Sequence, residues 1–190
     1  MTSHNPLPVS QWQRIAFDPL SWIDPGRLSL PTCLTGVRCR SIVNQVLLSS
    51  LELTHAVMPE PLNGISRLFI REWWLLREAG FLLACQRYRA SLALRGRIPP
   101  QPARVTQFSQ LALLESQHLQ GDSLLTVEMM HHRAALELLP FSCLLPEWLR
   151  QRLPLLFPPL SAEAKKGHGA HSADILLLKL AIQHAKRHPE

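Results

Sequence analysis

Apolar residues recur at spacings of three and four along most of the chain, which predicts amphipathic α-helices rather than strands. The first clear case is the stretch 34–57. Its apolar positions are Cys39, Ile42, Val43, Val46, Leu47 and Leu51. Pro59 and Pro61 are expected to end this helix, because proline does not continue a helical ladder.

Two further apolar stripes flank Gly80. One covers residues 62–76 and the other residues 81–92, and each leaves the opposite face polar. The register restarts near Gly80, and Gly96 offers a left-handed stop for the second helix. We predict that the two helices form a hairpin, and that the outer side of the second one carries Arg87, Ser91 and Arg95.

The second half of the chain gives a less regular pattern. Residues 105–117 continue at helical spacing, and residues 132–139 predict a helix that Pro140 stops. The stretch 123–130 between them fits either a strand or a helix.

A last helix is predicted over residues 173–186, with Ser172 as its N-cap. Between its polar ends, only Lys179 and Gln183 interrupt its apolar surface, so most of its circumference should be buried in the core or in a partner.

The segment 145–160 combines large apolar side chains with prolines, namely Pro146, Pro154, Pro158 and Pro159. Internal prolines remove amide donors and crowd the preceding turn, so this segment cannot be one long helix. Its Trp148 and Phe157 should nevertheless be buried. We predict a bent core segment that positions the last helix.

Two Asp-Pro pairs mark the N-terminal part, Asp18-Pro19 and Asp24-Pro25. Each pair places an N-cap acceptor before the residue preferred at the first helical position, which predicts two short helical turns. Three aromatic residues should anchor these turns to the domain, or alternatively form an arm that binds a partner. They are Trp12, Phe17 and Trp22.

These patterns predict an all-α, mainly helical fold. We expect a single compact domain over residues 1–190, made of helical hairpins with one proline-rich irregular segment. The ambiguous stretch leaves one short strand pair open. Residues 1–9 are expected to be a flexible N-terminus, and Arg97–Pro102 a stiff internal linker rather than a domain boundary.

Composition agrees with a globular chain, because 46% of the 190 residues are hydrophobic and 18% are charged. The 20 Lys and Arg residues exceed the 14 Asp and Glu residues, which gives a net charge of +6. A positive charge favours acidic partners, whether nucleic acid, an anionic membrane or an acidic protein face, without choosing among them.

The four cysteines form no CxxC pair, and the first residues lack a basic stretch followed by an apolar core. We therefore expect reduced thiols in the cytosol. Uninterrupted apolar runs such as Ile175–Leu178 are far shorter than the roughly 20 residues that span a bilayer, so no membrane segment is expected.

Sequence signatures of catalysis do not occur. The chain has no GxSxG elbow, no GxxxxGK[ST] or GxGxxG phosphate loop, no HExxH zinc helix and no DxDxDG calcium loop. His184 and His188 have metal-binding spacing, but no third ligand lies near in sequence, and we interpret them as exposed terminal histidines. We expect a protein that is not an enzyme and holds neither cofactor nor metal.

A second stripe follows the helix predicted over 62–76, outside its apolar face. It consists of Arg67, Arg71 and Trp74, and such residues are enriched in interface hot spots. We therefore interpret it as a candidate partner contact, while a solvated helix face is the alternative. The remaining candidate partner-binding residues are Arg87, Arg95, Trp12 and Trp22.

Three parts of the chain carry a resemblance to a known family. They are Trp12–Leu28, Leu82–Ala93 and above all Arg152–Pro159 (Arg-Leu-Pro-Leu-Leu-Phe-Pro-Pro), which is followed by the helix predicted near the C-terminus. These segments resemble, in the same order, the OrgA/MxiK family. This family is the K component of bacterial type III secretion systems that serve invasion of host cells.

The resemblance implies a cytoplasmic, non-enzymatic adaptor of the sorting platform beneath the injectisome. Its implied partners are the cytoplasmic domain of the inner-membrane ring protein and the Q-component protein, which forms C-ring-like pods. The protein would then lie at the cytoplasmic face of the bacterial inner membrane through the apparatus, without inserting into the membrane or binding nucleic acid.

The alternative is a helical nucleic-acid-binding regulatory protein, in which scattered arginines neutralise phosphates. The pattern is weaker, because basic runs are limited to short pairs such as Lys165-Lys166 and no recognised DNA- or RNA-binding signature occurs.

Overall fold

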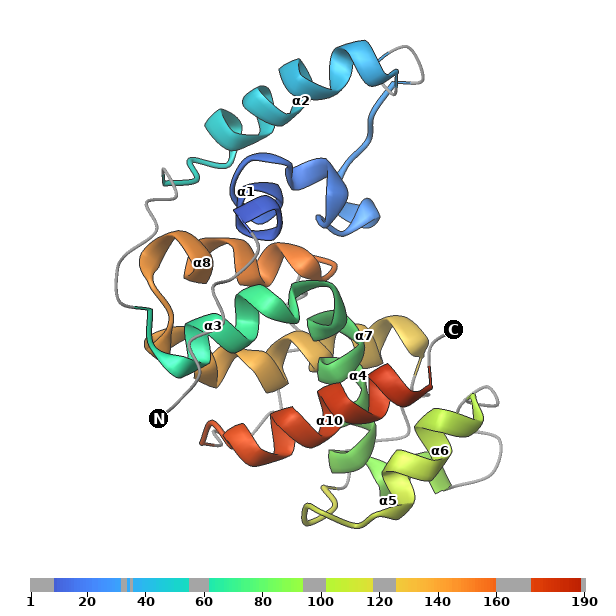
Figure 1. The fold of residues 1–190 in the computed structure, drawn as a ribbon. Coiled ribbons are helices and arrows are strands. Elements are labelled where there is room, and N and C mark those ends of the chain that lie inside the picture. Colours follow the sequence, from blue (N-terminus) through green and yellow to red (C-terminus); the bar gives the residue numbers. More distant parts are fainter. Residues whose placement is uncertain are drawn as a thin grey trace. The chain divides into compact units, whose positions relative to one another are not determined.

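The computed structural model describes seven stretches of the chain: 9–31, 34, 36–54, 62–93, 102–117, 126–159 and 172–188. All regular elements in these stretches are helical, which confirms the predicted all-α fold (Figure 1). The expected linker Arg97–Pro102, apart from Pro102, and residues 1–8 of the expected flexible terminus lie outside the described residues. The single-domain organisation stays a prediction.

The chain divides into two compact units, and each unit is assembled from segments that are distant in sequence. Unit 1 consists of Met1–Trp74 and Cys143–Leu156. Unit 2 consists of Leu75–Ser142 and Phe157–Glu190.

Unit 1 contains α-helices and short 3₁₀ helices, which are α1 (Val9–Phe17), η1 (Pro19–Ser21), η2 (Pro25–Arg27), α2 (Val37–Ser50), α3 (Gly64–Arg71), α8 (Glu147–Arg152) and η6 (Leu153–Leu156). The 3₁₀ helix η4 (Trp73–Leu75) follows α3. The two turns predicted from the Asp-Pro pairs are confirmed as η1 and η2. Only Asp24 caps its turn with its side chain, by accepting a hydrogen bond from the Gly26 amide at 2.9 Å.

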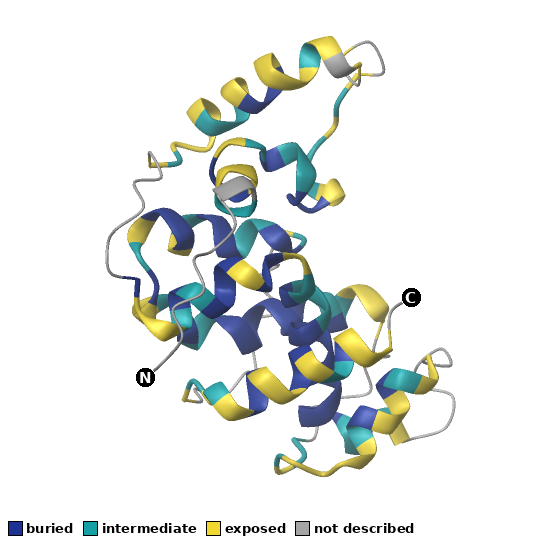
Figure 2. Cartoon of the chain, viewed as in Figure 1, coloured by how far each residue is buried: buried dark blue, intermediate teal, exposed yellow. Residues whose placement is uncertain are grey.

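Helix α2 is shorter than predicted, and its orientation was not foreseen. Val43 and Asn44 are buried, whereas Ile42 is 62% and Val46 59% exposed. Most of this helix is accordingly coloured as exposed in Figure 2. The apolar stripe located the helix correctly, but part of that stripe faces solvent, because polar bonds from Asn44 determine which side packs.

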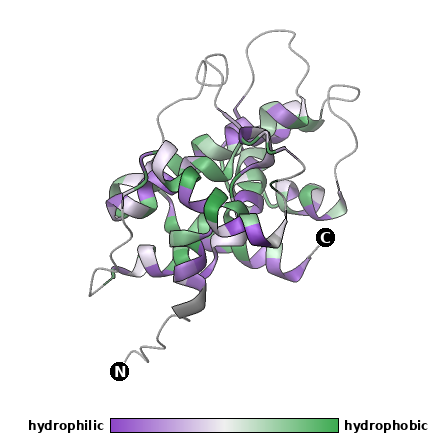
Figure 3. Ribbon diagram, turned by 90° about the horizontal axis from the view of Figure 1, so that it is seen from above, coloured by the Kyte–Doolittle hydropathy of each residue, from purple (hydrophilic) through white to green (hydrophobic). Residues whose placement is uncertain are grey.

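Unit 2 is built around α4 (Leu76–Arg87), which is buried over most of its length. It packs against α7 (Val127–Leu138), α10 (Ile175–Arg187) and α6 (Ala103–Gln110) (Figure 1). Two short elements complete this unit, α5 (Arg89–Ala93) and the 3₁₀ helix η5 (Leu139–Leu144). Along the helices of Figure 3, hydrophobic and hydrophilic positions alternate, as amphipathic helices require.

The turn predicted at Gly80 is wrong, because α4 begins at Leu76 and continues through this glycine. A Cβ atom at Gly80 would lie only 2.8 Å from the carbonyl oxygen of Ala134 in α7. The glycine is therefore needed for the close approach of two helices, not for a turn. The break in the apolar stripe lies earlier, where α3 ends at Arg71.

The second half of the chain differs from the prediction at its helix ends. Helix α6 ends at Gln110 rather than near residue 117, and Ala112 has a positive φ of 48°. Residues 127–130 are helical, which excludes a strand there, and residues 118–125 lie outside the described part. Pro140 is accommodated in η5 directly after α7.

The last helix, α10, begins later than predicted. Asp174 rather than Ser172 is its N-cap, and the Asp174 carboxylate accepts a hydrogen bond from the Leu177 amide at 3.0 Å. The unit 2 core covers only one side of α10, since Leu176 is 69% and Leu180 38% exposed.

The proline-rich segment is bent and buried, as predicted. Pro146 is the N-cap of α8, and the short η6 follows immediately. Most of its large apolar side chains are buried, namely Leu145, Trp148, Leu149, Leu153, Leu156 and Phe157, whereas Leu155 is half-buried.

Candidate interaction surface

Helix α1, helix α3 and the 3₁₀ helix η4 contribute an exposed surface of two arginines and one tryptophan in unit 1. The Arg14 guanidinium lies 4.7 Å from the ring centre of Trp74, which is 37% exposed. Arg71 is also exposed, and its Nε lies 2.8 Å from the Glu72 carboxylate. We call these residues the Arg14–Arg71–Trp74 surface. The sequence pattern identified Arg71 and Trp74 but missed Arg14, which comes from another helix.

The two helices are joined by hydrogen bonds from a single side chain. The Gln11 amide nitrogen donates to the carbonyl oxygens of Ile70 at 3.0 Å and of Arg71 at 2.7 Å. These carbonyls lie at the end of α3, where helical partners run out. Arg67, one turn before Arg71, is half-buried and makes a contact of its own.

The tryptophans near the N-terminus serve the core more than the surface. Trp22 is buried, donates to the Ile15 carbonyl oxygen at 3.2 Å and packs edge to face on Trp73, with ring centres 5.5 Å apart. Trp12 is half-buried, and its ring centre lies 6.4 Å from that of Trp148. Trp22 thus anchors its turn, as the first of the two interpretations predicted.

Arg87 does not lie on an outer helix side, so its predicted placement is wrong. It is buried and pairs with both carboxylate oxygens of Glu137 in α7, one of them at 2.8 Å from Nη2. Burial disfavours its charge, but the hydrogen bonds and the charge of Glu137 raise the pKa of Arg87 above its ordinary value. Ser91 is buried as well, and Arg95 lies outside the described residues.

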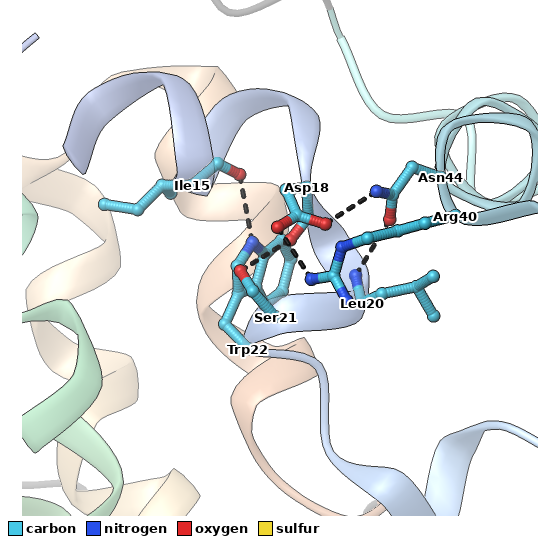
Figure 4. Close-up of polar contacts among 7 residues, drawn as sticks. All are labelled: Ile15, Asp18, Leu20, Ser21, Trp22, Arg40 and Asn44. Atoms are coloured by element: carbon cyan, nitrogen blue, oxygen red, sulfur yellow. Dashed lines mark hydrogen bonds and ion pairs between the residues drawn. The ribbon is translucent and has the colours of Figure 1, made fainter. Parts of the chain in front are cut away.

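A polar network attaches α2 to η1 (Figure 4). The Asp18 carboxylate accepts hydrogen bonds from Arg40 at 2.8 Å and from Asn44 at 2.6 Å, while the Asn44 side-chain oxygen accepts one from the Leu20 amide at 3.0 Å. Burial works to raise the pKa of Asp18, but these hydrogen bonds and the charge of Arg40 outweigh it and lower that pKa. Asp18 therefore holds a neighbouring helix instead of capping its own turn.

Arg152, from the end of α8, is the residue that sequence reasoning missed altogether. It is 1% exposed, and its guanidinium donates to the carbonyl oxygens of Trp148 at 2.7 Å and Ala16 at 3.0 Å. Both terminal nitrogens also reach the Thr54 carbonyl oxygen at 3.3 Å. One buried side chain thus connects α1, α8 and the segment after α2.

These acceptors are all neutral carbonyl groups. Among the described residues no carboxylate pairs with Arg152, and its Nε hydrogen has no acceptor. Burial lowers the pKa of Arg152 to about 10, which still leaves the side chain charged at neutral pH. The resulting cation has hydrogen bonds but no opposite charge.

A pocket of about 270 Å³ opens beside this arginine, within unit 1. Apolar groups of Ala16, Phe17, Leu48 and Leu53 form much of its wall. The pocket is also lined by Ser49, Glu52, Thr54 and Arg152 itself. Phe17 is 47% exposed at this position, although its aromatic ring was expected to serve as an anchor.

The histidine pair near the C-terminus is not simply exposed. His184 is half-buried, and its Nε2 atom lies 2.8 Å from the Arg104 carbonyl oxygen. The ring centres of His184 and His188 are 4.8 Å apart. Within the described stretches, no three His, Cys, Asp or Glu side chains are grouped to hold a metal ion.

The three cysteines in the described stretches, Cys39, Cys85 and Cys143, are not joined in disulfides there. Burial raises the pKa of the Cys85 thiol, and Glu78 adds to the effect, so this cysteine behaves as a small apolar core residue.

Across the described stretches, none of the helices has the length and apolar character needed to cross a bilayer.

Comparison with known proteins gives a consistent assignment. A family model described as "Bacterial type III secretion apparatus protein (OrgA_MxiK)" matches residues 12–187. No solved structure matches the chain significantly.

The curated relatives include proteins of Salmonella and of Shigella. "Oxygen-regulated invasion protein OrgA" of Salmonella typhimurium (strain LT2) is 34% identical over 194 residues, which cover 98% of this chain and 92% of the relative. "Protein MxiK" of Shigella flexneri is 34% identical over 77 residues, which cover 40% of this chain and 42% of the relative.

Proposed function

Because the chain belongs to the OrgA/MxiK family of bacterial type III secretion apparatus proteins, we propose that it is a non-enzymatic adaptor of the sorting platform. It links the cytoplasmic domain of the inner-membrane ring protein to the Q-component pods and so supports protein secretion. It acts at the cytoplasmic face of the inner membrane, held there by the apparatus rather than by a membrane segment.

The family match over residues 12–187 carries this proposal, because it spans nearly all of the chain. The exposed residue types of unit 1 are compatible with the binding of partner proteins by an adaptor. Arginine and tryptophan on the Arg14–Arg71–Trp74 surface are the residue types that dominate protein interfaces. We therefore propose this surface as one partner contact, together with the half-buried Arg67.

A double charge reversal tests this contact. Arg14→Glu with Arg71→Glu should weaken binding of either the ring-protein domain or the Q-component at least tenfold, because loss of a hot spot costs about 2 kcal/mol or more. The thermal melt followed by circular dichroism should stay cooperative. Its midpoint should fall, because Arg71→Glu removes the cation that pairs with the buried Glu72 carboxylate.

The matched control reverses two exposed arginines elsewhere, Arg38 and Arg187, and so changes the net charge equally. It should leave binding intact. If both variants lost binding equally, the loss would be due to the change in net charge and not to the proposed contact. Undiminished binding of both components by the Arg14/Arg71 variant would rule the surface out.

The adaptor role is tested separately in cells. Deleting the gene should abolish secretion and release the Q-component from the apparatus, while the ring protein stays assembled. Normal attachment of the Q-component in the deletion strain would refute the adaptor role. Retardation of DNA or RNA by the purified protein, lost steeply with added salt, would instead favour the nucleic-acid-binding alternative.

A further inference from the structure

The charge of Arg152 needs a partner that the described part of the chain does not supply. The carbonyl groups of Ala16, Thr54 and Trp148 satisfy the terminal nitrogens of its guanidinium, but they carry no net charge. A buried ion without an opposite charge is unfavourable even when it is hydrogen-bonded. The side chain also keeps its Nε hydrogen without an acceptor in the described stretches.

The wall of the pocket beside Arg152 is partly apolar, so the charge of this arginine is weakly screened and can attract an anion. Its wall includes Ala16, Phe17, Leu48 and Leu53, so the medium near the guanidinium is of low polarity. Charge interactions are less screened there than in water. Its volume of about 270 Å³ is suited to one or two amino-acid side chains rather than a large cofactor.

We propose that this pocket binds a carboxylate-bearing peptide segment of a partner protein. The carboxylate faces Arg152 and supplies a negative charge that the described residues do not pair with it, and an adjacent apolar side chain of the segment packs on Phe17 and Leu53. This inference goes beyond the adaptor role, because it concerns the chemistry of the pocket and holds whichever protein contributes the segment.

A carboxylate fits better than a phosphate group. The pocket offers one cation and mainly apolar wall groups, whereas phosphate sites usually combine several donors or cations. Glu52 also lines the pocket, and its negative charge repels a dianion more than a monoanion. The same Glu52 gives the proposal a test that leaves the buried arginine untouched.

Three N-acetylated peptides serve as probes of the full-length protein, and their binding is followed by the NMR shifts of the Phe17 and Ser49 amides. They are acetyl-Leu-Glu-Leu-amide, acetyl-Leu-Gln-Leu-amide and acetyl-Leu-Gln-Leu with a free C-terminal carboxylate. At least one peptide with a carboxylate should bind at least tenfold more tightly than the neutral peptide. The stronger of the two acids identifies a side chain or a chain end as the source.

Glu52→Gln should tighten binding of the acidic peptides by about threefold or more, since it removes a nearby repulsive charge. Glu115→Gln is the matched control, because it makes the same change at an exposed position that does not line the pocket. Arg152→Gln should abolish the preference for acidic peptides. If this variant fails to fold, the Glu52→Gln comparison decides.

Three results would overturn the proposal. They are equal binding of acidic and neutral peptides, absence of shifts with every peptide at millimolar concentration, and an effect of Glu52→Gln no larger than that of Glu115→Gln. Tighter binding of inorganic phosphate than of the acidic peptides would overturn the choice of a carboxylate.

Discussion

Several arginines that contribute to the positive charge of this chain do not reach its surface. In the described part, Arg87, Arg133 and Arg152 are all buried. Arg87 is neutralised by Glu137, and Arg133 stacks over Tyr88 and donates to its hydroxyl oxygen at 2.6 Å. The net charge of +6 therefore overstates the basic surface that could attract nucleic acid.

A single carboxylate, Asp18, makes part of the stability dependent on pH. Its pKa is lowered in the folded protein, so its stabilising effect is complete above the unfolded value of 3.8 and is lost as the pH falls through the folded pKa. Replacing it by Asn should cost about 1 kcal/mol at neutral pH, as is typical of partly exposed charged pairs. Urea unfolding at a series of pH values measures this difference.

The difference between wild type and Asp18→Asn should stay constant near neutrality and shrink once the pH falls below 3.8. In an Arg40→Gln background the same substitution should cost less, because one of the two hydrogen-bond donors to Asp18 is gone. A difference that grows on acidification would contradict the proposed direction of the pKa shift.

The burial of single residues could be predicted where it depends on their own character. The predictions failed where burial depends on contacts with residues distant in sequence. The aromatic and apolar character of Trp22, Trp148 and Phe157 was sufficient to place them in the core. The burial of Arg87 depends on Glu137, fifty positions away along the chain. Arg152 binds carbonyl groups of residues 16 and 54, so no pattern around it marked the pocket.

At the scale of helices, the same distinction explains what the sequence pattern could predict. The Asp-Pro turns need only adjacent residues, and both formed where expected. The orientation of α2 was not predictable from its own sequence, because Arg40 and Asn44 bind Asp18 in another segment. Gly80 was interpreted as a break between two helices, because the sequence pattern does not reveal its contact with Ala134 in α7.

The close approach of α4 and α7 at Gly80 leads to a prediction for this pair of helices. Alanine is a better helix former than glycine, but its Cβ would lie 2.8 Å from the Ala134 carbonyl oxygen. Backbone atoms cannot move away cheaply, so Gly80→Ala should destabilise the protein by about 1–3 kcal/mol. Urea unfolding measures the change.

Gly64→Ala is the matched control for this substitution. It lies at the start of α3, where an added Cβ would meet no atom within 4 Å. Its effect should be neutral or stabilising by up to about 1 kcal/mol. Equal effects of the two alanines would show that close packing at Gly80 is not what requires glycine.

The whole molecule is organised so that both units need the C-terminal part of the chain. Unit 1 receives α8 from Cys143–Leu156, and unit 2 receives α10 from the segment after it. A protein truncated after Ser142 therefore lacks the Arg152 contacts of unit 1 and the helix that packs on α4 in unit 2. We expect this fragment to show no cooperative thermal transition by circular dichroism.

The full-length chain, melted under the same conditions, is the reference for the truncated one. A cooperative transition of the fragment would mean that the N-terminal segments contain a complete folding unit.

The interleaved origin of the two units also governs when the protein can fold during its synthesis. Translation delivers the chain from the N-terminus at about 5–20 residues per second. The face of α4 that packs on α10, and the groups of unit 1 that contact Arg152 in α8, must therefore stay uncovered for several seconds, until these closing segments leave the ribosome. Neither unit should complete its folding before residues 143–190 are translated, and until then the nascent chain is a natural client for chaperones that shield apolar surface.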